Sequence, residues 1–168
     1  MTNLNPTNQE ILERFISSRE RLRAATQNLT AAELDTPSEP GGWTVRQIIH
    51  HVADDGDVFS LCIKKAIATP GAAVRFEGFP GNEAWAEGLG FERRAVETSL
   101  ALIDAHRAAI AALVSDFPDA WEQPVQFFNE AGEAAGTFSV GQMVGMLGDH
   151  LVEHVASIEK ALSDHHRL

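Results

Sequence analysis

The stretch SVGQMVGMLGDHLVEHVASIEKAL, residues 139–162, decides the fold class. Its apolar residues recur every three or four positions from Val140 to Leu162, which is the period of an amphipathic helix. Ser139 and Gln142 have the spacing of a capping box, in which side chain and backbone satisfy each other's free groups at a helix start. The stretch therefore predicts a helix of about six turns.

Three further segments upstream carry the same period. They cover residues 8–28, 44–68 and 92–116, and a single helical turn is expected at residues 31–34. Residues 69–90 are rich in Pro and Gly and predict a long loop, whereas residues 124–139 predict either a short hairpin or an extended connection. Without an internal repeat or a low-complexity tract, residues 1–168 are expected to form a single all-α domain, a four-helix bundle.

The charge balance and the cysteine count narrow the function classes. The formal net charge of -11 repels phosphate backbones and anionic lipid surfaces. No apolar run approaches the roughly 18 to 20 residues of a membrane helix, and the polar residues 1–9 lack the regions of a signal peptide. The single cysteine, Cys62, excludes an internal disulfide and suits a reducing compartment. We therefore expect a cytoplasmic protein that acts on a small molecule, without nucleic-acid or membrane partners.

Two histidines on the last predicted helix have the spacing of a metal site. His150 and His154 stand four residues apart, so both side chains leave the same face one turn apart. At 100° per residue they lie about 80° and 40° from the centre of the apolar stripe, on the shoulder of the core. Spacing alone leaves open an ordinary pair of partly buried histidines that bond to neighbouring groups.

Helical phase separates the remaining histidines. His51 lies about 100° from the centre of its apolar stripe and His50 about 160°, so His50 is expected to face water and His51 an inter-helix groove. His106 lies about 60° from the apolar centre of its helix, which admits it as an alternative ligand. His165 and His166 are expected to be exposed in a frayed tail.

Two segments resemble the DinB/YfiT-like proteins, a large group considered to be metal-dependent enzymes. Residues 41–54, GGWTVRQIIHHVAD, resemble the second helix of that family, and residues 150–158, HLVEHVASI, resemble its last helix. Both occur in the family's order and at a similar separation. The resemblance implies an up-down-down-up bundle in which one histidine of the second helix joins two of the last helix on a metal, often zinc or nickel. By motif position these ligands are His51, His150 and His154.

The chain departs from the family pattern just after Asp54. The common Ser or His positions appear here as residues 55–57, DGD. Asp55 stands four residues after His51 and in phase with it, so it is a candidate fourth ligand or hydrogen-bond partner of a ligand, and Asp54 is the position shared with the family. A solvated acidic turn is the alternative for both.

Three neutral imidazoles leave a transition ion with open positions, which is typical of catalytic sites. Zn or Ni is expected first, and Mn or Fe next. Because thiol-dependent transferases that use bacillithiol or mycothiol occur in the family, the resemblance favours transfer of a low-molecular-weight thiol to an electrophile. A hydrolase that uses metal-bound water is the first alternative, and a non-enzymatic module that binds a metal or ligand is the second. Family analogy also implies a homodimer.

Other reactive or aromatic residues receive no catalytic role. Cys62 lies eleven helical residues from His51, or roughly 16 Å along the axis, so it is predicted to be a core residue. Trp85 and residues 76–79 are expected either to line the mouth of a pocket or to pack on the bundle.

Overall fold

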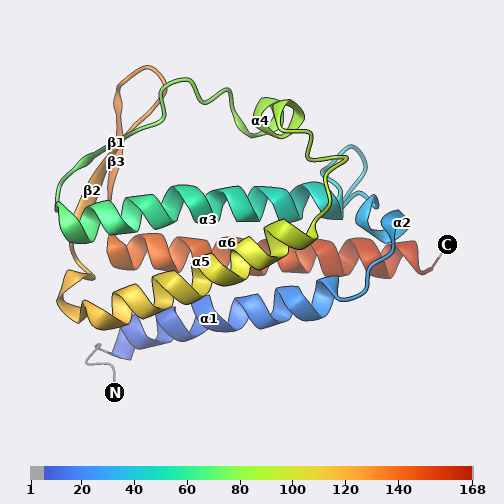
Figure 1. The fold of residues 1–168 in the computed structure, drawn as a ribbon, viewed down its shortest axis with the longest axis horizontal. Coiled ribbons are helices and arrows are strands. Elements are labelled where there is room, and N and C mark those ends of the chain that lie inside the picture. The colour runs from blue at the N-terminus through green and yellow to red at the C-terminus, as the bar shows by residue number, and fades with distance from the viewer. Residues whose placement is uncertain (1–5, 168) are drawn as a thin grey trace.

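Four long helices form the body of the protein in a computed structural model that describes residues 6–167. In Figure 1 the first and last of them run in one direction and the middle two run in the other. The four are α1 (Pro6–Thr26), α3 (Val45–Ala68), α5 (Glu97–Asp116) and α6 (Val140–His165). The prediction of a mostly helical protein built on four long helices is confirmed. Residues 1–5, part of the polar start discussed above, lie outside the described residues.

Capping boxes fix the starts of both helices that carry the candidate site. The Thr44 side chain accepts from the Gln47 backbone at the start of α3, and Ser139 accepts from Gln142 at the start of α6. In both boxes the glutamine side chain accepts in return from the backbone of the capping residue. These boundaries agree with the ones predicted from sequence.

The segment between α3 and α5 is more ordered than the sequence suggested. The predicted loop at residues 69–90 contains a strand, β1 (Ala73–Arg75), and a short helix, α4 (Asn82–Gly88). The helix predicted at residues 92–116 is shorter in the structure, where α5 begins at Glu97. Residues 76–96, called the strap below, pass along α3 on the side away from α1 (Figure 1).

A small sheet lies at one end of the bundle (Figure 1). The antiparallel hairpin of β2 (Pro124–Phe128) and β3 (Ala134–Ser139) forms where the sequence left open a hairpin or an extended connection. β1 adds to β2 in parallel, giving the order β1-β2-β3. Two short elements complete the described chain: α2 (Ala31–Leu34) and a 3-10 helix, η1 (Pro118–Ala120). The hairpin was one of the two predicted alternatives, whereas the strand β1 was not predicted.

The core consists of two groups of buried side chains. One, beside the sheet, includes Ile63 of α3 and Leu147 of α6, and the other includes Ile49 of α3 and Leu151 of α6. The site histidines are interleaved with residues of the second group, because His51 stands between Ile49 and Val52 on α3 and His154 stands between Leu151 and Val155 on α6. Packing of this group therefore holds the two helices in register at the site.

Helix α5 has the length and the apolar composition of a helix that could cross a membrane, which was not expected from the sequence. It is the one helix in the described part of the chain that is long and apolar enough to cross a membrane by those criteria alone. Core helices of bundles share that composition, and α5 buries Ile103, Ile110 and Val114 in the fold. The lack of a membrane partner stays a prediction.

Candidate metal centre

Three histidine rings from α3 and α6 converge on one point. His51, His150 and His154 each contribute one ring nitrogen, and these nitrogens lie within 4.8 Å of one another. Nε2 of His150 is 3.4 Å from Nε2 of His51 and 3.0 Å from Nε2 of His154. Nitrogen ligands around a tetrahedral ion with bonds near 2.0 Å stand about 3.3 Å apart. The trio therefore has the spacing that a transition ion requires.

Burial keeps the three imidazoles in the form that binds metal. Burial first, and the neighbouring rings second, lower the pKa of His51 to about 4 and that of His154 to about 4. Burial also lowers the pKa of His150. Neutral rings offer a lone pair to a cation, so an ion entering near neutral pH would have no protons to displace from them.

Asp55 is the acidic side chain that approaches the trio. One of its carboxylate oxygens, Oδ2, lies 3.2 Å from Nδ1 of His150 and 3.5 Å from Nε2 of His51. Burial first, and the charge of Asp54 second, raise the pKa of Asp55 to about 7. A divalent cation at the trio would oppose this rise, because it favours the ionised carboxylate. The structure thus brings Asp55 to the histidines, which agrees with the candidate role that its helical phase admitted and not with a solvated acidic turn.

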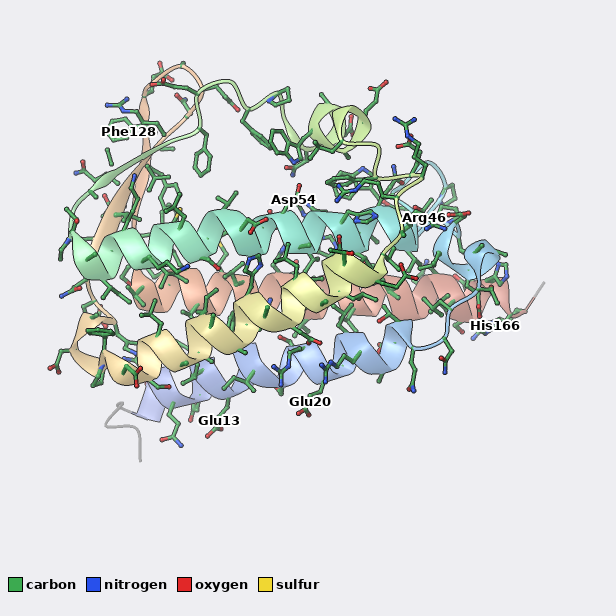
Figure 2. All side chains as sticks on the ribbon, in the orientation of Figure 1. Glu13, Glu20, Arg46, Asp54, Phe128 and His166 are labelled. Carbon is green, nitrogen blue, oxygen red and sulfur yellow. The ribbon has the colours of Figure 1, made fainter. Side chains whose placement is uncertain are left out.

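Asp54 takes part in a different contact. It projects from α3 toward the strap (Figure 2), and the indole nitrogen of Trp85 donates a hydrogen bond to its Oδ2 at 2.8 Å. Phe79 lies against Trp85 with ring centroids 5.7 Å apart, whereas Phe76 stacks on Phe127 of the sheet. Asp54 and these aromatic residues therefore anchor the strap to the bundle.

Trp43 is a neighbour of the site that the sequence analysis did not single out. Its ring meets His51 edge-on with centroids 4.9 Å apart. The sequence could have indicated Trp43, because this residue lies within residues 41–54, which resemble the family, directly before the capping residue Thr44. Trp43 forms an apolar wall on one side of the trio.

The expectation that His50 faces water was wrong. His50 is fully buried, with Nδ1 2.8 Å from the Ser99 hydroxyl and Nε2 3.3 Å from the Arg94 carbonyl. The ring of Phe91 lies 5.3 Å away, centroid to centroid. Phase on a single helix places His50 on an outer face, but the end of the strap and the start of α5 cover that face.

His106 does not join the trio. Its Nε2 lies 2.9 Å from Oδ1 of Asp57, and its ring lies so close to Gly56 that an added Cβ there would be 2.4 Å from Nδ1. Among residues 6–167, the group with metal-binding geometry consists of the three histidines already named. The alternative of His106 as a ligand is therefore not supported.

The two histidines at the end of α6 contact polar side chains and do not lie in a frayed tail, contrary to expectation. Nε2 of His166 lies 2.8 Å from Oε1 of Glu33, and Nδ1 of His165 lies 3.2 Å from Oγ1 of Thr36. Only the exposed position of His166 agrees with the prediction, because His165 is partly buried. Contacts with α2 and the residue pair after it hold this end of α6.

Cys62 is a core residue, as predicted. It is buried and free, and burial raises the pKa of its thiol to about 11. A thiol that is protonated and enclosed does not act as a nucleophile near neutral pH.

Comparison with known proteins identifies the family of this chain and supports its fold. The sequence profile described as the DinB superfamily matches residues 14–158. A Bacillus mycoides (strain KBAB4) protein is 30% identical over 162 aligned positions, covering 92% of this chain and 89% of the relative. A Bacillus cereus (strain B4264) protein is 29% identical over 167 positions, covering 94% and 91%. Both relatives carry the name "Putative metal-dependent hydrolase".

A solved structure supports the fold independently. YfiT from Bacillus subtilis, described as a probable metal-dependent hydrolase with an unusual four-helix bundle topology, superposes with a TM-score of 0.82. The match covers 99% of this chain and 92% of YfiT, at 23% sequence identity. With the profile match spanning most of its length, the chain belongs to the DinB superfamily.

Proposed function

We propose that this protein is a metal-dependent hydrolase whose divalent ion is held by His51, His150 and His154. The observation that carries the proposal is the convergence of three neutral imidazole nitrogens at the spacing of a transition ion. Imidazole donors suit zinc, nickel and iron, with zinc and nickel the first expectations and manganese or iron the next. The names of the relatives support hydrolysis over other uses of the same ion.

The chemistry of such a site follows from its donor set. A divalent ion held by the three neutral imidazoles would keep open positions, and it would supply a Lewis acid for a carbonyl or phosphoryl oxygen and a more nucleophilic water. The chain itself contributes the surroundings: the Trp43 ring beside His51 excludes water from one side, and Asp55 supplies a carboxylate beside His150. Cys62 is too deeply buried to form a covalent intermediate.

An open groove beside the trio has the size of a small-molecule site. It measures about 830 Å³, and His150 is part of its wall. The wall also includes the apolar side chains of Ile11, Phe138 and Met146 and the carboxylate of Glu153. Volumes between about 300 and 1,000 Å³ are usual for small-molecule pockets. We therefore expect a small-molecule substrate, handled in the reducing compartment that the free Cys62 suits.

Activity measurements on metal-loaded protein test the proposal. The wild-type protein is freed of metal with a chelator, reloaded with zinc or nickel, and assayed on a panel of carboxylic esters, amides and phosphoesters. Hydrolysis is expected to require the metal and no added thiol, and to disappear in His154→Ala. His166→Ala is the matched control, because it removes a histidine at the C-cap of the same helix, outside the trio.

The same assay separates the alternatives. Turnover that needs a low-molecular-weight thiol, with the sulfur found in the product, would show that the protein is the thiol transferase expected from sequence and not a hydrolase. Metal binding without turnover of either kind would favour the non-enzymatic module. Equal hydrolysis by metal-free and metal-loaded protein would contradict the proposal.

A further inference from the structure

Oδ2 of Asp55 lies closer to Nδ1 of His150 than to Nε2 of His51, from which it is 3.5 Å away. It is 3.2 Å from Nδ1 of His150, whereas the nitrogen of that ring that faces His51 and His154 is Nε2. A carboxylate next to a ring nitrogen accepts a hydrogen bond when that nitrogen carries the proton. In a neutral imidazole the other nitrogen then carries the lone pair.

We propose that Asp55 is a positioning residue: it accepts a hydrogen bond from Nδ1 of His150 and thereby fixes the ring with the lone pair of Nε2 directed at the metal centre. This inference rests on the proposed metal site. Carboxylates that accept from the outer nitrogen of a metal-binding histidine orient the ring and raise its basicity.

The fold supports this role because the two partners sit on different helices. Asp55 follows His51 by one turn of α3, and His150 precedes His154 by one turn of α6. The carboxylate therefore links α3 to the ring whose Nε2 lies 3.4 Å from Nε2 of His51 and 3.0 Å from Nε2 of His154. Its side chain is 26% exposed, so water competes little for the hydrogen bond.

Asp54 offers a matched control on the same turn. It carries the same charge one residue away, but its observed hydrogen bond comes from the indole nitrogen of Trp85. Replacement of Asp54 by Asn therefore removes the same charge near the site without removing the contact to His150. A purely electrostatic contribution of nearby acidic charge would appear in both variants, whereas orientation of His150 would be lost only in the Asp55 variant.

The first measurement is the tautomer of His150 in metal-free protein, read by nitrogen-15 NMR in mildly alkaline solution. The expected state has the proton on Nδ1 in the wild-type protein and in Asp54→Asn. Asp55→Ala is expected to shift His150 toward the Nε2-protonated form that a free histidine side chain prefers. A wild-type ring with the proton on Nε2 would overturn the proposal, and this result needs no variant to fold.

The second measurement is metal affinity, obtained by competition with a chromophoric chelator. Asp55→Asn is expected to weaken zinc binding about ten- to a hundredfold, the usual effect of removing such a partner, while Asp54→Asn stays near wild type. X-ray absorption should show the same first coordination sphere in wild type and Asp55→Asn. Loss of an oxygen ligand would overturn the proposal by making Asp55 a direct ligand, and unchanged affinity would overturn it as well.

The two measurements test the role of Asp55 separately from the proposed function. A wild-type protein that binds no metal contradicts the metal centre, yet its His150 tautomer still decides whether Asp55 orients the ring. A protein that binds and uses metal normally after Asp55→Asn contradicts only the role of Asp55.

Discussion

His50 and His51 are neighbours in sequence, yet their surroundings differ in kind. The two ring nitrogens of His50 face the Ser99 hydroxyl and the Arg94 carbonyl, so its hydrogen-bonding groups have partners in the fold. Nε2 of His51 instead faces the rings contributed by α6. A buried polar group with partners supports structure, whereas several lone pairs facing one another have no good arrangement without a proton or a cation between them.

The different surroundings give the two histidines different roles. α3 places His50 toward α5 and the strap, where the ring closes the packing around Phe91. It places His51 toward α6, where the donor set of the candidate metal centre is assembled. Replacement of the two residues should therefore change different properties of the protein.

The largest effect is expected from His51→Ala. Because removal of a ligand's outer partner alone weakens metal binding ten- to a hundredfold, loss of a ligand should weaken it at least about a hundredfold. Competition with a chelator measures the change, and circular dichroism checks that the variant is folded. An affinity equal to that of wild type would remove His51 from the site and break the distinction between the two histidines.

The next effect is expected from His50→Leu, and it concerns stability. The variant leaves the Ser99 hydroxyl and the Arg94 carbonyl without their partner, which should lower the free energy of unfolding by roughly 1–3 kcal/mol. Urea denaturation in the presence of chelator measures it. Metal affinity should stay near the wild-type value, so a loss of metal comparable to that in His51→Ala would contradict the division of roles.

Unfolding free energies measured over a range of pH test whether His50 is neutral in the folded protein. Burial lowers its pKa in the folded protein below the usual 6.5, so as the pH falls the unfolded chain takes up the proton first. The stability that neutral His50 contributes is therefore present above pH 6.5 and decreases below it. The difference in unfolding free energy between wild type and His50→Leu should shrink on acidification. A constant or growing difference would show that His50 is not held in the neutral form.

The smallest effect is expected from Asp57→Asn. Its carboxylate pairs with His106, but the Asp57 side chain is 60% exposed and water screens the pair. The change in unfolding free energy should stay within about 1 kcal/mol, as is usual for exposed ion pairs. Metal affinity should not change. A large loss of metal in this variant would bring His106 back as a ligand.

Much of the fold was readable from local patterns. The apolar period and the caps at Thr44 and Ser139 located α3 and α6, and phase together with family resemblance selected the three histidines that the structure brings together. These features were readable because helix periodicity and capping depend on residues three or four apart.

What could not be predicted depends on contacts between distant segments. β1 forms by pairing with β2 about fifty residues later, and a three-residue strand has no period of its own. His50 looked exposed because phase on one helix contains no information about Phe91 and Ser99, which cover it from another part of the chain. The position of Asp55 beside His150 likewise depends on the register between α3 and α6.

The metal content of three proteins tests the central claim most directly. Wild type, His51→Ala and His50→Gln are purified without chelator, incubated with zinc or nickel, freed of unbound ions and analysed by inductively coupled plasma mass spectrometry. We predict one metal ion per chain in wild type and in His50→Gln, and none in His51→Ala. Equal metal content in all three proteins, or none in wild type, would contradict a metal centre built on His51, His150 and His154.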